Sequence, residues 1–386
     1  MKYINPNEYG SLLYDELEKK YLNNVINARR IFRYSKTDYP YVKLAEEKIC
    51  SIVRSKYCLG ITNGTSALKA ALVGAGIKAN DRVLISSYTF LATAFAVISL
   101  GAIPIPIEVD LDNGLNLKDL EEEIKKGCNA VIAVHFQGRA FNLNKVRKLT
   151  KEYNIPLIED ACQAFGANYK GTYAGTFGDI GVYSFQQFKQ ISTGEGGAIV
   201  TNNETILNRI RNYTDEGSVR DHFPSWNNEE ALFGENERMN NLIGAVLYAQ
   251  LEKYDYMLSK QKEIRTKIMK NLKDIKNIIS SKDPKGDTSM NILILLNDNK
   301  YMEKAIELAK ESNIELRHMW SSLYYDNDLF KRNKLTSKDL KGKECSFTKD
   351  LISKMLVISI PPILNEEDIT KITNLILKLK DEGYME

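Results

Sequence analysis

Hydrophobic positions follow two different periods along this chain of 386 residues. Near the start, YDELEKKYLNNVI and YVKLAEEKICSIV place apolar side chains three and four positions apart, which is the spacing of an amphipathic helix. From about residue 57 onwards, short apolar runs such as YCLGIT, RVLISS, IPIPIEV and NAVIAVHF alternate with stretches at helical spacing such as ALKAALVGAGI. The pattern predicts short buried strands that alternate with helices.

Alternating strands and helices predict an α/β fold with a mostly parallel central sheet between two layers of helices, because right-handed crossovers place helices on both faces of such a sheet. The runs PLIED, IGVYSF and GAIVTN are further predicted strands, and Lys189 lies in the connection between the last two. We therefore expect Lys189 at the edge of the sheet where α/β proteins bind ligands.

The second half of the chain predicts a separate, smaller domain. Residues 211–237 are polar and contain Gly and Pro, which indicates a long loop. Residues 238–272 predict one very long amphipathic helix, and MNILILL with two later amphipathic stretches predicts a second α/β unit. We expect a large domain over residues 1–250, including the N-terminal helical segment, and a small C-terminal domain over residues 251–386.

Composition narrows the class of protein. Hydrophobic residues at 43% and charged residues at 27% are typical of a globular protein, and the net charge of +3 comes without a basic block, which argues against a nucleic-acid partner. The longest apolar patch, FLATAFAVISLGAIPIPI, is interrupted by Thr, Ser, Gly and Pro, so no membrane span is expected. The polar N-terminus lacks a signal-peptide core and the five cysteines form no CxxC pair, which predicts a cytoplasmic protein with reduced thiols and no metal site.

Two features at the ends of predicted strands point to a ligand site. The stretch ITNGTSAL brings Gly64, Thr65 and Ser66 to the start of a helix, where backbone N–H groups and hydroxyls can hold one phosphate, although helix capping by Thr or Ser would give the same pattern. It is neither GxGxxG nor a P-loop, so it favours neither a dinucleotide nor a nucleoside triphosphate. Asp160 ends an apolar strand, where it can face a ligand or cap the next helix.

Lys189 is the third feature. A partly buried lysine can form a Schiff base with an aldehyde, whereas a solvated surface lysine has no such role. A phosphate cradle, a strand-end carboxylate and a loop lysine are together what pyridoxal phosphate requires, because they anchor its phosphate, keep its ring nitrogen protonated and carry its aldehyde. The combination predicts a pyridoxal phosphate site, and the glycines of GEGG allow the loop to turn back into GAIVTN.

Five stretches together resemble the DegT/DnrJ/EryC1/StrS family of pyridoxal phosphate-dependent aminotransferases, which act on keto sugars and cyclitols. These stretches are TNGTSAL, SSYTFLATAFAV, IEDACQAFGA, GDIGVYSFQQFKQISTGEGGAIVTNN and NERMNNLIGAVLYAQLEKYD. The resemblance runs from about residue 40 to residue 260 and continues faintly to VISIPPILNEEDI. It implies the fold-type I architecture, with the cofactor in the large domain.

The resemblance also implies a role for individual residues. Lys189 and Asp160 match the catalytic pair, which are the Schiff-base lysine and the partner of the pyridine nitrogen. The other matched positions are cofactor ligands: Gln163 near the ring hydroxyl, Phe90 on the ring face with Tyr88 as the weaker candidate, Gly64, Thr65 and Ser184 at the phosphate with Ser66 beside them, and Asn236 at the phosphate of the other subunit.

Some neighbouring residues have an alternative without a direct role in function. Arg238 can orient its loop, Cys162 is by default a small buried filler, and His135 is either a satisfied buried histidine or a neighbour of the site. In ELRHMWSS, where the family often has an Arg-Pro-His run, His318 and Trp320 either line the substrate entrance or pack at its rim. His222, in the long loop, meets either substrate or solvent.

The resemblance implies a homodimer with shared active sites that transfers an amino group from glutamate or glutamine to a ketone on a nucleotide sugar or a cyclitol. The two glutamines before Lys189 are similar to the branch that includes scyllo-inosose aminotransferases and aminohydroxybenzoate synthase. One alternative is sugar dehydration on the same scaffold, but dehydrases that resemble this family have a histidine in place of the lysine. The other is a non-catalytic ligand-binding protein, which would be favoured by loss of Lys189 or Asp160, and neither is lost.

Overall fold

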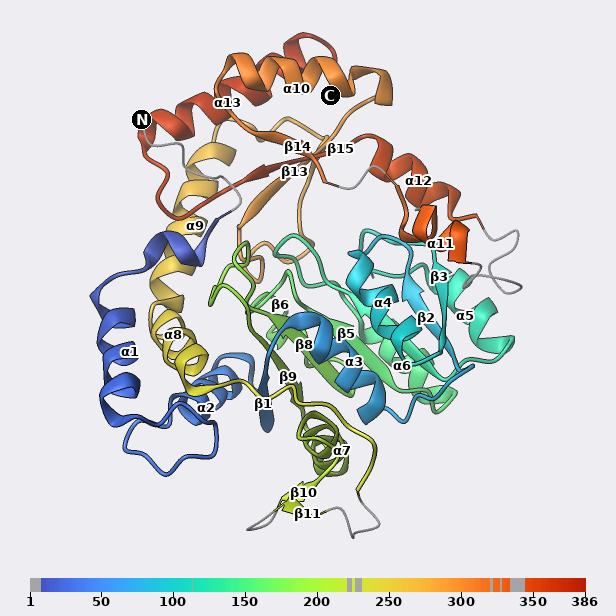
Figure 1. Cartoon of the computed structure of the whole chain (residues 1–386). Helices are drawn as coiled ribbons and strands as arrows, with labels where there is room; N and C mark the ends of the chain where they lie inside the picture. The colour runs from blue at the N-terminus through green and yellow to red at the C-terminus, as the bar shows by residue number, and fades with distance from the viewer. Residues whose placement is uncertain are drawn as a thin grey trace.

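The structure is a computed structural model that describes residues 8–112, 114–220, 224–225, 231–319, 322–326, 328–333 and 344–386. Figure 1 shows a large α/β unit below and a smaller unit above, with helix α9 running from one to the other. His222 and Trp320, for which the sequence left two interpretations each, lie outside the described residues.

The large unit is built on a seven-stranded sheet with the order β1-β9-β8-β5-β4-β2-β3. Neighbours from β8 to β3 are parallel, whereas β9 is antiparallel to both β8 and β1. The sheet is therefore mostly parallel, as the sequence predicted. Its strands are β1 (Tyr57–Ile61), β2 (Arg82–Ser86), β3 (Ile103–Ile107), β4 (Ala130–Val134), β5 (Leu157–Asp160), β8 (Ile180–Ser184) and β9 (Gly197–Thr201).

Helices cover both faces of this sheet because its strands are apolar on both. In β4, Ala130 and Ile132 belong to one core cluster, whereas Val131 and Ala133 belong to another on the opposite face. The helices of the large unit are α1 (Glu16–Ala28), α2 (Tyr41–Val53), α3 (Gly64–Gly74), α4 (Leu91–Ser99), α5 (Leu117–Lys125), α6 (Asn144–Glu152), α7 (Glu204–Thr214) and α8 (Asn241–Glu252), with the short η1 (Gly10–Leu13) before them.

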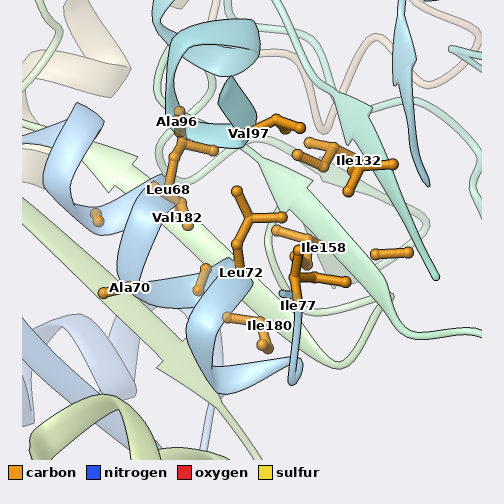
Figure 2. Packing of buried hydrophobic residues seen from close by; sticks show 14 of the residues in the cluster. Leu68, Ala70, Leu72, Ile77, Ala96, Val97, Ile132, Ile158, Ile180 and Val182 are labelled. Carbon is orange, nitrogen blue, oxygen red and sulfur yellow. The ribbon is translucent and has the colours of Figure 1, made fainter. Parts of the chain in front are cut away.

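Helix α3 is central to the core on one face of the sheet. Figure 2 shows Leu68 and Leu72 of α3 beside Val182 and Ile158 of the sheet, and all four side chains are buried in one cluster. Since α3 begins directly after β1, this packing fixes the start of α3 beside the ends of the central strands.

The small unit has a four-stranded antiparallel sheet with the order β12-β13-β15-β14. Helices α10, α13 and the second half of α9 share one apolar core with it. The elements that follow α8 along the chain are α9 (Tyr254–Met269), β12 (Ile278–Ile279), β13 (Asn291–Leu295), η2 (Asn299–Tyr301), α10 (Met302–Glu311), β14 (Leu316–His318), η3 (Tyr324–Asp326), α11 (Asp328–Asn333), α12 (Ser346–Ser353), β15 (Met355–Ser359) and α13 (Glu366–Asp381). Of these, η3 and α11 place Tyr324 and Phe330 in a core of the large unit. Two short hairpins, β6 (Asn168–Tyr169) with β7 (Thr172–Tyr173) and β10 (Val219–Arg220) with β11 (Pro224–Ser225), complete the described elements.

The prediction of a single helix over residues 238–272 is wrong, because the helix is interrupted at Lys253 between α8 and α9. The Lys253 ammonium pairs with Glu18, 2.6 Å away, and donates to the Leu13 carbonyl oxygen. These contacts hold the junction against the N-terminal segment. The first part of the long loop predicted over residues 211–237 is also helical, since α7 continues to Thr214.

Helix α9 contributes to both cores. Tyr254 and Met257 pack in a core of the large unit, whereas Ile264 and Ile268 pack in the core of the small unit. The domain boundary placed between residues 250 and 251 therefore stays a prediction. All five cysteines are free thiols, and within the described parts of the chain every helix is too short or too polar to span a membrane.

Candidate active site

A cavity of about 780 Å³ opens where the parallel strands of the large sheet end. Val134, Asp160 and Ser184 are the last residues of β4, β5 and β8, and all three line this cavity. The facing wall comes from the small unit, through Met290, Asn291, Arg317 and Met319. The cavity therefore lies between the two units, which is a common place for a ligand site.

Seven of the nine residues predicted to bind or process a cofactor line this one cavity, and they come from separate segments of the chain: Gly64, Thr65, Phe90, Asp160, Gln163, Ser184 and Lys189. The remaining two, Ser66 and Asn236, are not among its lining residues.

The start of α3 forms one end of the cavity. Helix capping, the alternative considered for Thr65 and Ser66, is performed by Asn63, whose Oδ1 accepts the backbone N–H of Ser66 at 2.8 Å. The first N–H groups of a helix have no partner inside it, so this end attracts an anion. Gly64 and Thr65 present that end to the cavity, while Ser66 is engaged in the cap.

Gly64 allows α3 to approach β8 closely. A Cβ atom at this position would lie 2.8 Å from Cβ and 3.2 Å from Oγ of Ser184, closer than carbon atoms tolerate. The absent side chain therefore lets the helix N-terminus and the Ser184 hydroxyl line one end of the cavity side by side, and we call this end the Gly64–Ser184 concavity. Backbone N–H groups and a hydroxyl at one place suit a compact anion such as one phosphate group.

Asp160 lies at the base of the cavity with only 5% of its surface exposed. The Thr93 hydroxyl donates to its Oδ2 at 2.7 Å, and the Cys162 backbone N–H donates to its Oδ1 at 3.2 Å. Thr93 Oγ1 is in turn 2.7 Å from Thr89 Oγ1. The carboxylate is thus held in one orientation, and no ion pair to it is found among the described residues, so its negative charge is available to a cationic group of a ligand.

Lys189 lies in the connection between β8 and β9, as predicted, and is half-buried. Backbone hydrogen bonds from Phe185 to Gly196 and from Gln187 to Gly194 keep the two arms of this connection together. Gly194 has a left-handed φ of 79°, and a Cβ atom on Gly197 would lie 2.6 Å from the Asn63 carbonyl carbon. The glycines therefore allow the sharp turn and the close approach to the α3 N-terminus.

The ring of Phe90 is 55% exposed and lies at the cavity, immediately before α4. Tyr88, the weaker candidate for the same role, is buried and packs edge-on against Phe136 with ring centroids 5.1 Å apart. An aromatic ring at the cavity wall can stack on a planar ring of a ligand.

His135 is a satisfied buried histidine and is also one of the residues that line the cavity. Its Nε2 is 2.8 Å from Glu159 Oε2, and its Nδ1 accepts the backbone N–H of Phe141 at 3.0 Å. Because Nδ1 accepts, the proton is on Nε2 and is donated to Glu159. Glu159 also accepts from the Gly175 and Gly178 backbone, so this pair holds loops together.

Cys162 and His318 have packing roles. Burial raises the pKa of the Cys162 thiol well above its usual value, and the neighbouring Asp160 carboxylate raises it further, so the thiol stays protonated and poorly nucleophilic. The His318 ring is 2.8 Å from the Ile352 carbonyl oxygen and is not among the residues that line the cavity.

Asn236 lies on the surface, in a backbone bridge with Asp215. Arg238, two residues further, pairs with Asp215 and lies 3.2 Å from Glu216, so it orients this loop as the alternative interpretation held. Within its own chain Asn236 does not line the cavity.

Sequence reasoning missed several polar residues of the cavity wall, among them Tyr9, Gln137 and Asn291. Tyr9 precedes η1 in a segment without a recognisable motif, and Asn291 is simply the first residue of β13. Gly10, next to Tyr9, lies against the Gln190 carbonyl oxygen, where a Cβ atom would be 2.7 Å away. This contact with the Lys189 loop places Tyr9 at the cavity, and no local sequence pattern predicts such a contact.

The arrangement suits one kind of ligand: a planar aromatic ring with a phosphate at one end and a cationic nitrogen at the other. The concavity at Gly64 can hold the phosphate, the buried Asp160 can face the nitrogen, and Phe90 can stack on the ring. Lys189 lines the same cavity and supplies the amine that can bind an aldehyde. These residues fit pyridoxal phosphate.

Comparison with known proteins agrees with this description. The sequence profile of the DegT/DnrJ/EryC1/StrS aminotransferase family matches residues 14–377. GDP-perosamine synthase of Escherichia coli O157:H7 is 34% identical over 259 residues, which cover 67% of this chain and 69% of that relative. UDP-4-amino-4,6-dideoxy-N-acetyl-beta-L-altrosamine transaminase of Campylobacter jejuni is 35% identical over 57% of this chain and 58% of that relative.

Solved structures share the fold. Helicobacter pylori PseC, an aminotransferase involved in the biosynthesis of pseudoaminic acid, matches with a TM-score of 0.82 at 22% identity, over 96% of this chain and 97% of that chain. The fold class predicted from the sequence is confirmed.

Proposed function

Because this chain belongs to the DegT/DnrJ/EryC1/StrS aminotransferase family and is a pyridoxal phosphate-dependent aminotransferase, we propose that it aminates the ketone of a nucleotide-linked sugar, with glutamate or glutamine as the amino donor. The observation that carries this proposal is the meeting of Lys189, Asp160 and the Gly64–Ser184 concavity in one cavity. When bound, pyridoxal phosphate supplies an aldehyde that holds an amine covalently and a protonated ring that withdraws electrons from the carbon beside that amine.

The phosphate end is assigned to the start of α3. Gly64, Thr65 and Ser184 offer backbone N–H groups and hydroxyls there, and the helix N-terminus favours a negative charge. Ser66 supports this end through its hydrogen bond to Asn63. Asn236 is assigned to the phosphate of the other subunit.

Asp160 would keep a proton on the ring nitrogen of the bound cofactor. Its two donors, Thr93 and the Cys162 backbone, fix the carboxylate, and its burial keeps water from competing for the charge. Phe90 would cover one ring face, and Gln163 would hydrogen-bond the ring oxygen.

Lys189 is assigned the proton transfers. With the cofactor bound, Lys189 Nζ would act as the general base that takes the proton from the α-carbon of the amino donor, and then as the general acid that gives a proton to the former aldehyde carbon of the cofactor. The same steps in reverse deliver the amino group to the ketone. Sugar dehydration is not favoured, since this chain has Lys189 and its relatives include a UDP-sugar transaminase and a UDP-sugar aminotransferase.

Six amide side chains are among the polar residues that line the cavity: Asn63, Gln137, Gln163, Gln186, Gln190 and Asn291. An amide both donates and accepts hydrogen bonds, which suits a hydroxyl-rich ligand such as a sugar or a cyclitol. The names of two relatives contain GDP-linked and UDP-linked sugars, which favours a nucleotide-linked sugar over a cyclitol.

A homodimer belongs to the same proposal. Five large apolar side chains are exposed in the segment between α1 and α2 and at its edge: Ile26, Ile31, Phe32, Tyr34 and Tyr39. The Arg238 guanidinium lies over the Phe32 ring at 5.8 Å, so this apolar segment adjoins the loop that carries Asn236. A second copy that covers the segment would bring Asn236 toward the partner's cavity, and a cytoplasmic location agrees with the five free thiols.

A ketone panel tests the substrate. The protein loaded with pyridoxal phosphate is given glutamate or glutamine with a GDP-linked keto sugar, a UDP-linked keto sugar or scyllo-inosose, and products are identified by mass spectrometry. We expect an amine at the former carbonyl carbon of a nucleotide-linked sugar. Turnover of scyllo-inosose alone would contradict the substrate class and leave the aminotransferase activity standing.

A further inference from the structure

A chain of hydrogen bonds crosses the cavity wall from the N-terminal segment to Gln163. The Tyr9 hydroxyl donates to Asn291 Oδ1 at 2.8 Å, and Asn291 Nδ2 donates to Gln137 Oε1 at 2.6 Å. Gln137 Nε2 then donates to Gln163 Oε1 at 3.4 Å, which is the longest link. We call these four side chains the amide relay.

The direction of the amide relay is set at the Tyr9 end. Arg317, which can only donate, gives a hydrogen bond to Ser359 Oγ at 2.5 Å, so the Ser359 proton is free to go elsewhere. Burial raises the pKa of Tyr9, while hydrogen bonding with Ser359 and the charge of Arg317 oppose that rise. The Tyr9 hydroxyl itself donates to Asn291 Oδ1, which fixes the direction at this end of the relay.

Each amide of the relay then has one possible orientation. Asn291 accepts through Oδ1 and must donate through Nδ2, and Gln137 likewise accepts through Oε1 and donates through Nε2. Gln163 Oε1 is thereby occupied. The Nε2 group of Gln163 is the part left to face a ligand in the cavity.

The backbone at Gln137 has an unusual conformation, which places the Gln137 side chain between Asn291 and Gln163. Gln137 has a left-handed φ of 57°, which is uncommon for a residue other than glycine, and Gly138 follows with a φ of 78°. The Gly138 N–H donates to the Gln163 carbonyl oxygen at 2.8 Å, and its own carbonyl oxygen accepts from Thr288 N at 3.0 Å. The left-handed pair thus joins the turn at Gln163 to the small unit.

We propose that Tyr9, Asn291 and Gln137 are positioning residues that aim the Nε2 group of Gln163 at the ring oxygen of the bound cofactor. This inference rests on the proposed function, because Gln163 meets a ring oxygen only if the cavity holds pyridoxal phosphate. An N–H donor stabilises that oxygen in its ionised form. The relay therefore lowers the pH at which the visible absorption of the bound cofactor changes.

Asn291→Asp reverses the relay. An aspartate still accepts from Tyr9 but cannot donate to Gln137. Gln137 then turns its amide so that Nε2 donates to the new carboxylate and Oε1 faces Gln163. Gln163 in turn donates to that Oε1 through its own Nε2. A carbonyl oxygen of Gln163 then faces the cofactor. We expect the midpoint of the visible pH titration to rise by about one pH unit, about tenfold in the ionisation constant.

The new negative charge could raise the midpoint by itself, so a double-mutant cycle separates the two effects. In a Gln137→Met background the relay is cut between Asn291 and Gln163, and only the charge effect of Asn291→Asp remains. The shift should be clearly smaller there than in the wild-type background. Equal shifts in both backgrounds would overturn the proposal.

A matched control and a milder variant complete the test. Asn277→Asp makes the same change in the small unit, where Asn277 Nδ2 bonds the Leu295 carbonyl oxygen away from the cavity, and it should leave the midpoint unchanged. Tyr9→Phe keeps the ring and removes the donor, so the midpoint should rise by a smaller amount. An unchanged midpoint in folded Tyr9→Phe protein would also overturn the proposal.

The other charged and titratable groups that line the cavity stay in place in every variant: His135, Asp160, Cys162, Lys189, Glu195 and Arg317. Failure of the proposed function has a different signature, because wild-type protein would then show no visible absorption with pyridoxal phosphate at any pH. If the visible band instead has the same pH midpoint in wild-type and Asn291→Asp protein, the proposed function is supported and the role of the amide relay is contradicted.

Discussion

At the scale of single residues, Asp160 carries the clearest chemical assignment. It is nearly fully buried, it is oriented by two hydrogen-bond donors, and among the described residues it has no cationic partner. A buried carboxylate without a counter-charge is costly, so the site is stabilised when a ligand brings a positive charge. We assign this positive charge to the protonated ring nitrogen of the bound cofactor.

Asp160→Asn should therefore keep the fold and lose turnover. The amide is nearly isosteric and can meet the Thr93 hydroxyl, which accepts as well as donates. We expect kcat to fall by about three orders of magnitude, which is about 4 kcal/mol in activation free energy. Steady-state kinetics measure the loss, with Asp298→Asn, an exposed cap of η2, as the control that should keep full activity. Near-normal turnover in Asp160→Asn would mean that another residue serves the ring nitrogen.

Sequence reasoning found Asp160 and Lys189 because each follows from a local pattern, a strand end and a strand-to-strand loop. Tyr9 and Asn291 could not be found in this way. They reach the cavity only because the N-terminal segment lies on the Lys189 loop and the small unit lies over the large one. Such contacts between distant segments leave no periodic signal in a single sequence.

At the scale of elements, the approach of α3 to β8 shapes the phosphate end of the site. Gly64→Ala would place a Cβ atom 2.8 Å from Cβ of Ser184 and push the helix start away from the strand. Overpacking of this kind costs about 1–3 kcal/mol, so we expect the affinity for pyridoxal phosphate to fall about tenfold or more. Titration of the apoprotein with pyridoxal phosphate, followed by absorbance, measures this affinity.

Gly74→Ala is the matched control in the same helix. Its Cβ atom would lie 2.5 Å from Cγ1 of Ile210, at the opposite end of α3 from the cavity. Its thermal stability should fall while cofactor affinity stays near that of the wild type. Equal cofactor affinities for the two variants would argue against a phosphate site at Gly64.

Predictions of whole elements succeeded where one period continues over a full strand or helix, as in β4 and α13. The break at Lys253 was missed because apolar residues continue at helical spacing on both sides of it. Its physical cause is distant in sequence, since the Lys253 ammonium is held by Glu18 and the Leu13 carbonyl oxygen. Periodicity reports which face is buried and does not report where a helix is bent by a tertiary contact.

At the scale of the whole molecule, we propose that two chains together complete each site. Asn236 is exposed and lies outside the cavity of its own chain, next to the exposed apolar segment that carries Phe32. In a symmetric dimer each Asn236 would serve the partner's cavity.

Subunit mixing tests this arrangement. Lys189→Ala and Asn236→Asp proteins are each expected to be inactive, the first for lack of the amine and the second because an added carboxylate repels the phosphate. In a mixed dimer a trans contact places both defects in one site and leaves the other intact. Mixing with subunit exchange should therefore recover activity, at most about a quarter of the wild-type level because half the dimers are mixed.

The control mixes Lys189→Ala with Asp160→Asn. Both residues line the cavity of one chain, so every site of the mixed dimer keeps one defect and no activity should return. Absence of recovery in the Lys189→Ala and Asn236→Asp mixture, with exchange demonstrated by native mass spectrometry, would count against the trans contact.

The central claim is that this cavity carries out amino transfer through Lys189, and one half-reaction tests it most directly. One aliquot of protein loaded with pyridoxal phosphate is reduced with borohydride, and peptide mapping of that aliquot should find the cofactor on Lys189. Glutamate or glutamine is then added to unreduced protein with no ketone present. The account predicts loss of the visible absorption band and release of one keto acid per site. If the cofactor is on Lys189 and neither these donors nor alanine or aspartate changes the band, the aminotransferase account is contradicted.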